Sequence, residues 1–412
     1  STVWNYINQL LNRITVDKKR TGSLEFTTTH RPHHVRHSPN YSLSKISLDD
    51  RDLPRKMHDG NRVKAYYAYD VTSGCIIGKA HSRDKDRSLF IDCIRDMFRL
   101  IENNGFGLPL EVEVEHHLVS NFADGLMKAG QVFPFVRWCN PGNSQEKRAE
   151  HFNRAKKYGV EKDTQNGIGR FYAKLEANRP KVEKVDNQFT DKRYTYDQLI
   201  ADDIESIKAY NNELHPKQKK YPGLTRWQVL CQNLNPNLGG MDKALLYKYI
   251  GEKTLTSIRR SQYCTVQNEK YQIEKPEILS RLSSGNYEVE AYWLADSEGV
   301  IDHVYLFQHD EYICTATKIV AYNEATCEQS DEDREEYTKQ AKYVSHFDKT
   351  IKDRKNKLNK IAIMPAETID EIESIQVETV EHKSISNQED DIEKLIEEYD
   401  PREYQDKAHY DF

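Results

Sequence analysis

The sequence predicts an α/β domain with a mixed five-stranded sheet and helices, followed by a small all-β barrel and a charged, partly disordered C-terminal tail. Apolar alternation recurs in short runs over the first half of the chain, and stretches with a helical period lie between them. A second series of five short strands, separated by turn residues, is expected between 255 and 322, at 263–266, 271–273, 287–293, 304–307 and 312–316. The last fifty residues are acidic and poor in core-forming side chains, which is typical of disorder.

The pattern in the first half predicts three antiparallel strands, and then further strands that each follow a helix. The expected strands are 43–50, 62–71, 75–80, 109–115 and 132–138, and the expected helices are 87–103, 118–129 and 143–158. The whole chain is expected to divide into an N-terminal helix and basic arm (1–40), a catalytic domain (41–215), a linker (216–254), a small barrel (255–322), a charged helix (323–360) and an acidic tail (361–412).

Three acidic residues stand where these elements begin or end. Asp49 ends one apolar-alternating run, Glu115 ends another, and Glu150 opens a stretch that is typical of a helix. Carboxylate oxygens are the ligands that hard divalent ions prefer. Two such ions can activate one oxygen and stabilise the leaving one during displacement at phosphorus. The three acids are therefore candidate catalytic residues and candidate ligands for two Mg²⁺ or Mn²⁺ ions.

Three segments resemble the DDE transposases and retroviral-type integrases, and most closely the Mu-type bacterial transposases. They are 48–53 (LDDRDL), 69–74 (YDVTSG) and 140–150 (NPGNSQEKRAE), in that order along the chain. The resemblance implies that the catalytic domain is RNase H-like and that the enzyme cleaves 3′ ends of mobile-element DNA and joins them to target DNA. It implies that Asp49 bridges both ions, while Glu115 and Glu150 each complete one coordination sphere.

The same resemblance implies the partners. We expect mobile-element ends and target DNA, a self-oligomer on DNA, and an ATPase target-selector protein bound through 361–412. Basic and polar residues around the site are expected to hold DNA phosphates; they are His116, Lys147, Arg148, Asn153, Arg154, Lys156 and Lys157. Two other functions stay open. One is a nuclease of the same fold that does not join DNA, and the other is a catalytically impaired DNA-binding accessory protein.

Each acid has a rival, and the family normally has Asp where this chain has Glu115. Glu111, Glu113 and Glu115 alternate onto one face of their strand, so Glu113 is the rival of Glu115, and strand-end position favours Glu115. A strand side chain one residue away points to the opposite face, so only one of Asp49 and Asp50 can enter the site. Glu146 is the rival of Glu150.

The amino-acid composition indicates the cellular compartment and the distribution of charge along the chain. The seven cysteines are dispersed and odd in number, which is typical of free thiols in a reducing compartment. No run of eighteen apolar residues occurs, so we expect no membrane partner. The free thiols favour a cytoplasmic protein, and the resemblance to Mu-type transposases implies a bacterial or phage origin. The segment 361–412 has sixteen acids and four bases, so the net charge of −6 leaves a body of +6, which suits phosphate contacts.

Overall fold

The computed structural model describes residues 2–22, 25–26, 29–32, 36–115, 119–139, 147–161, 165, 183–185, 188–190, 193–296 and 298–358. The chain divides into two compact units, 1–348 and 349–412, and the second is described only as far as 358. The acidic tail at 361–412, His116 and Glu146 lie outside the described residues. None of the described helices is long and apolar enough to cross a membrane.

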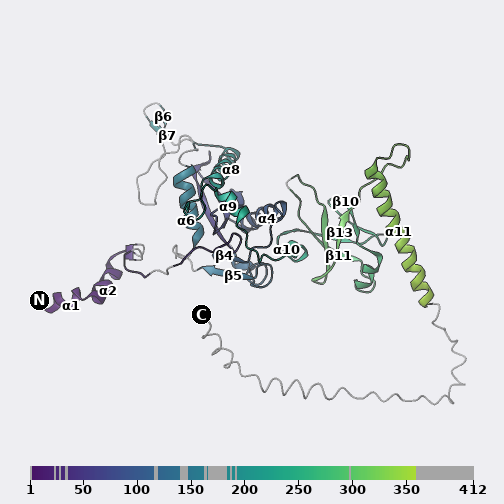
Figure 1. The fold of residues 1–412 in the computed structure, drawn as a ribbon, viewed down its shortest axis with the longest axis horizontal. Coiled ribbons are helices and arrows are strands. Elements are labelled where there is room, and N and C mark those ends of the chain that lie inside the picture. The colour runs from purple at the N-terminus through teal and green to yellow at the C-terminus, as the bar shows by residue number, and fades with distance from the viewer. Residues whose placement is uncertain are drawn as a thin grey trace, which may run out of the picture. The chain divides into compact units, whose positions relative to one another are not determined.

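A mixed five-stranded sheet lies at the centre of the first half (Figure 1). Its strand order is β3-β2-β1-β4-β5, which is the RNase H-like topology. The first three strands pair antiparallel, and β4 and β5 run parallel to β1. The strands are β1 (Lys45–Lys56), β2 (Arg62–Asp70), β3 (Ile76–Ser82), β4 (Glu111–Glu115) and β5 (Phe135–Cys139). This order confirms the fold class that the sequence predicts.

Alternate residues of the strands face two different layers. On one face Leu48 and Val112 share a core with α4 (Arg87–Asn103). Gly78 of β3 lets that helix come close, because an added Cβ would lie 2.7 Å from Met97 Cβ. The other face is covered by α6 (Arg148–Lys156), the π-helical turn η2 (Lys157–Glu161) and α8 (Tyr196–Asn212), which pack on tyrosines of β2. Within one strand, odd-numbered and even-numbered residues therefore contact different helices.

The strand β5 begins at Phe135, later than the expected 132, and two other elements of this domain differ from the expectation more strongly. The strand β1 continues to Lys56, so Asp49 lies within the strand and not at its end. The helix expected at 118–129 is a single short turn, η1 (Ser120–Phe122), within the described part of that segment. Glycine weakens helices, and Gly125 stands within the segment 118–129.

A six-stranded antiparallel sheet forms the nearly closed barrel of the second half. Its order is β8-β11-β12-β13-β10-β9. The edge strands β8 and β9 contact each other through a hydrogen bond from Thr256 Oγ1 to Thr265 O at 3.0 Å. Five strands were expected, and β8 is the additional one. The strands are β8 (Glu252–Ser257), β9 (Tyr263–Val266), β10 (Glu269–Ile273), β11 (Glu288–Trp293), β12 (His303–Gln308) and β13 (Glu311–Lys318).

The remaining elements connect or flank these two sheets. The segment 216–254, expected to be a linker, holds α9 (Arg226–Gln232) and α10 (Lys243–Ile250), which bury Leu230 and Ile250 in the core beside α4. The helix α11 (Asp331–Leu358) matches the expected charged helix. The other elements are α1 (Thr2–Asn8), α2 (Leu10–Arg20), the hairpin β6 (Glu183–Val185) and β7 (Gln188–Thr190), and η3 (Pro276–Arg281).

Candidate active site

Asp49 points to the face of the sheet that α6 covers, and both of its oxygens have partners. Lys147 Nζ lies 2.5 Å from Asp49 Oδ1. Asn153 Nδ2 donates to Asp49 Oδ2 at 2.9 Å, while Asn153 Oδ1 accepts from Tyr69 OH at 2.7 Å. Burial raises the pKa of Asp49, although the nearby ammonium of Lys147 opposes this. Asp49 is thus a buried carboxylate that α6 and its first flanking residue hold in place.

The neighbouring Asp50 has a different surrounding. It forms an ion pair with Lys85, at 2.6 Å between Asp50 Oδ2 and Lys85 Nζ, and Lys85 lies in the segment that leads into α4. The alternation of β1 places Asp50 on the opposite face from Asp49. Of the two rivals, Asp49 is the one that contacts residues at the start of α6.

Glu115 stands beside Asp49 across two parallel strands. The pairing of β1 with β4 joins Lys45 to Glu111 and Ser47 to Glu113, so the same register brings Glu115 level with Asp49. Glu115 Oε1 lies 3.4 Å from Lys147 Nζ, the same ammonium that contacts Asp49. The two carboxylates therefore share one cation.

Its rival Glu113 is fully buried and has a structural role. Glu113 Oε1 accepts from Ser47 Oγ at 2.9 Å and from the backbone N–H of Arg148 at 3.1 Å. Glu113 Oε2 lies 2.6 Å from Lys45 Nζ. In addition, Ser47 Oγ accepts from the backbone N–H of Ala149 at 3.0 Å. These bonds fix the beginning of α6 against β1 and β4, and they leave Glu115 as the acid that faces Lys147.

Glu150 lies in the first turn of α6 and faces the same cavity as Asp49. The cavity has a volume of about 420 Å³. Burial raises the pKa of Glu150, and the negative charge of Asp49 raises it further, so the two carboxylates are electrostatic neighbours. The cavity is lined by Asp49, Asp50, Arg51, Asp52, Pro54, Arg62, Glu150, Asn153, Arg154, Lys157 and Tyr158.

The fit of this site to a divalent ion is partial. Asp49, Glu115 and Glu150 offer the oxygen donors that Mg²⁺ and Mn²⁺ prefer. Within the described ranges, however, no three His, Cys, Asp or Glu side chains form a group that could hold a metal ion. The ammonium of Lys147 lies between Asp49 and Glu115 instead. Asp49 and Glu150, which line one cavity, are the acids best placed to share an added cation.

Of the expected DNA-contacting residues, His116 lies outside the described residues and Asn153 is bonded to Asp49, and the five basic ones fall into two groups. Arg154 is exposed, Arg148 and Lys157 are half-buried, and Arg154 and Lys157 line the cavity beside Glu150. Lys147 and Lys156 are buried, with 2% and 0% of the residue exposed, and both are ion-paired with carboxylates. In this structure the ammonium groups of these two lysines are therefore not available to a DNA phosphate.

A second, basic cavity of about 340 Å³ lies near the start of α6. Its lining residues come from five separate segments of the chain: Arg36, His37, Pro39, Lys45, Val71, Arg137 and Arg148. Burial lowers the pKa of His151, and the positive charges of Arg148, Arg154 and Arg36 lower it further. Arg148 Nη2 donates to Arg36 O at 3.4 Å, which joins the arm to the start of α6. The sequence predicts a basic arm within 1–40, but nothing in it points to Arg137.

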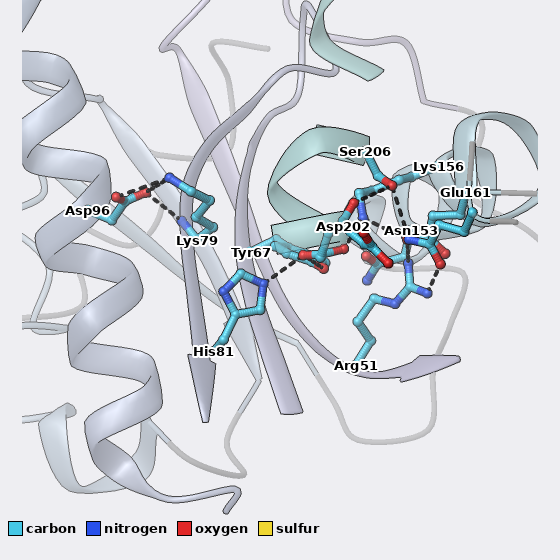
Figure 2. A network of polar contacts seen from close by, with 12 residues as sticks. Arg51, Tyr67, Lys79, His81, Asp96, Asn153, Lys156, Glu161, Asp202 and Ser206 are labelled. Carbon is cyan, nitrogen blue, oxygen red and sulfur yellow. Dashed lines mark hydrogen bonds and ion pairs between the residues drawn. The ribbon is translucent and has the colours of Figure 1, made fainter. Parts of the chain in front are cut away.

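A buried charged network, which we call the α6 anchor, lies under the same helix (Figure 2). It consists of Arg51, Tyr67, His81, Lys156, Glu161 and Asp203. Lys156 Nζ lies 2.6 Å from both Glu161 Oε1 and Asp203 Oδ1. Arg51 donates two bonds to Glu161, at 2.8 and 2.9 Å.

The other end of the α6 anchor reaches β2 and β3. Asp203 Oδ2 accepts from Tyr67 OH at 2.7 Å and lies 2.7 Å from His81 Nε2. Although burial opposes ionisation, the charge of Lys156 and the bonds from His81 and Lys156 hold the pKa of Asp203 well below its usual range. The anchor connects β1, β2, β3, α6 and α8, and so it fixes the helix that carries Glu150 and Asn153 over Asp49. Sequence reasoning missed it, since its members are far apart in the chain.

No protein-family model matches this chain, and no curated protein matches its sequence. The class of the first domain therefore rests on its sheet order, which is RNase H-like.

Proposed function

We propose that this protein is a DNA transposase or integrase that cleaves 3′ ends of mobile-element DNA and joins them to target DNA. The observation that carries the proposal is that Asp49 and Glu150 line one cavity beside α6 of an RNase H-like domain, while Glu115 contacts the same lysine as Asp49. The resemblance of three ordered segments to Mu-type transposases supports the same reaction.

The reaction requires two displacements at phosphorus. In the first, water attacks a phosphodiester, and the broken P–O bond leaves a 3′-hydroxyl on the element end. In the second, that hydroxyl attacks a target phosphodiester, so one P–O bond forms and one breaks with no net change in their number. A divalent ion bound at these carboxylates would polarise the phosphoryl oxygens and lower the pKa of the attacking hydroxyl or water.

The protein residues supply position and charge. Asp49 of β1 and Glu150 of α6 would bind the cation, and Asn153 would keep the carboxylate of Asp49 oriented. Arg154 and Lys157 on the cavity wall would face the phosphates next to the scissile bond.

The basic cavity supports binding of a longer nucleic-acid segment. Lys45 and Asp49 lie four residues apart on one face of β1, or about 13 Å at roughly 3.3 Å per residue. At about 3.4 Å of rise per nucleotide, this is about four base steps of B-form DNA. One strand would therefore pass both the acidic cavity and the basic cavity lined by Arg137 and Arg148.

The test is DNA joining in the presence of Mg²⁺ or Mn²⁺. The protein is mixed with a labelled duplex that carries a free 3′-hydroxyl at a pre-cut element end and with a supercoiled target plasmid. Joined products are expected with the wild type and are expected to be lost in Asp49→Asn. The matched control is Asp96→Asn, on the opposite side of the sheet, where Asp96 pairs with Lys79. Cleavage without joining would instead identify a nuclease.

One observation favours a second candidate, a catalytically impaired DNA-binding accessory protein. The ammonium of Lys147 neutralises part of the carboxylate charge that a metal ion needs. The second candidate predicts DNA binding with neither cleavage nor joining, and no difference between the wild type and Asp49→Asn in the plasmid experiment.

A further inference from the structure

We propose that Lys147 takes the place of one of the two metal ions, so that the site holds a single divalent ion and a lysine ammonium. This inference rests on the proposed function and specifies its metal requirement. It changes the expectation of two ions that the family resemblance implies.

The first argument is the position of the ammonium. Lys147 Nζ lies 2.5 Å from Asp49 Oδ1 and 3.4 Å from Glu115 Oε1, between the two strand carboxylates. A bridging metal ion would bind these same oxygens. Asp49 Oδ2 is turned toward Asn153 on the side of the cavity, where Glu150 is also found. One side of Asp49 is thus occupied by a cation of the chain, and the other side faces a cavity with a second acid.

The second argument is that the backbone beside Lys147 is fixed. The next two backbone N–H groups, of Arg148 and Ala149, donate to Glu113 and to Ser47. Both acceptors are fully buried. Because Lys147 itself is 98% buried, its ammonium would lose its carboxylate partners if it left this position. The lysine is therefore a built-in part of the site.

The third argument is the charge balance. Asp49, Glu115 and Glu150 carry three negative charges when ionised, and Lys147 carries one positive charge. The remaining charge of −2 is neutralised by one divalent ion, whereas two such ions would leave an excess of +2. Asp50 does not alter this count, because it is paired with Lys85, and Arg154 and Lys157 on the cavity wall would balance the DNA phosphates that they face.

The experiment counts Mn²⁺ ions bound to the full chain without DNA, by electron paramagnetic resonance and by calorimetric titration. Acidic residues elsewhere bind Mn²⁺ weakly and equally in all variants, so each count is taken relative to Asp49→Asn. We expect one Mn²⁺ for the wild type and two for Lys147→Met, with the spin–spin broadening of a close Mn²⁺ pair. The matched control Lys85→Met should remain at one.

A second variant separates the role of the ammonium from a general disturbance. In the double variant Lys147→Met with Glu115→Gln, the position between Asp49 and Glu115 has lost one of its two carboxylates. The number of bound Mn²⁺ ions should therefore return to one. A wild-type count of zero or two overturns the inference, and so does a count of one for Lys147→Met. Failure to join DNA while the counts are as expected refutes the proposed function alone. Joining by a wild type that binds two Mn²⁺ refutes only the single-ion inference.

Discussion

Replacing Lys156 by methionine should destabilise the first domain strongly, because it removes the central cation of the α6 anchor. Lys156, Glu161 and Asp203 are all fully buried. The substitution deletes two contacts of 2.6 Å and leaves two buried carboxylates with one cation fewer. Methionine keeps most of the apolar volume of the lysine stem, so the loss is mainly one of charge.

The expected cost follows from what remains around the two carboxylates. Removing one partner of a buried ion pair typically costs about 3–5 kcal/mol. Glu161 would keep its two bonds from Arg51, and Asp203 would keep Tyr67 and His81. We therefore expect the lower end of that range, about 3 kcal/mol. For a domain of this size it corresponds to a lower Tm by about 6–12 °C.

The measurement is urea unfolding of the wild type and the variant, followed by tryptophan fluorescence and circular dichroism. The matched control is Lys208→Met, an exposed lysine of α8, which should change the free energy of unfolding by less than about 0.5 kcal/mol. Adding Asp203→Asn to Lys156→Met should recover part of the loss, because it removes one of the uncompensated charges. If Lys156→Met lowers the free energy of unfolding by less than about 1 kcal/mol, the charges of the α6 anchor do not stabilise the fold.

Two further predictions concern the site and its pH dependence. Asn153→Ala should weaken Mn²⁺ binding by about 10–100-fold, because the bond that orients Asp49 is lost, and an unchanged affinity in a calorimetric titration would contradict this. The pKa values of Asp203 and Glu161 are lowered in the folded protein, so their stabilisation is present above the unfolded pKa values, at about 4, and is lost as the pH falls toward the folded ones. Thermal unfolding between about pH 5 and pH 2 should show a falling Tm, with a smaller fall in Asp203→Asn.

Much of the fold could be predicted because it depends on local patterns. The helix at 87–103 was expected with the bounds that α4 has, since its apolar face repeats with a helical period over seventeen residues. The strand 263–266 was likewise expected with the bounds of β9. The short turn at 120–122 was missed, because apolar residues in that segment contribute to the core without a regular helix.

The candidate site was less accessible to sequence reasoning. Glu113 and Glu115 alternate onto one face of β4, and nothing in their order shows which one is bound by Ser47 and the start of α6. Lys156 and Lys157 are neighbours with the same charge, yet only Lys156 turns inward to Asp203. Such differences arise from contacts between segments that are more than thirty residues apart.

Local patterns in the sequence establish the alternation of β1 and β4, the helical face of α4 and the position of Glu115 at the end of a strand, because side-chain periodicity is a local property of the backbone. The folded chain, in contrast, is what brings Asp49 and Glu115 to the same Lys147 ammonium and turns Glu150 toward the cavity of Asp49. The physical reason is that charge and burial depend on neighbours in space, and parallel pairing of β1 with β4 and the docking of α6 bring those neighbours together.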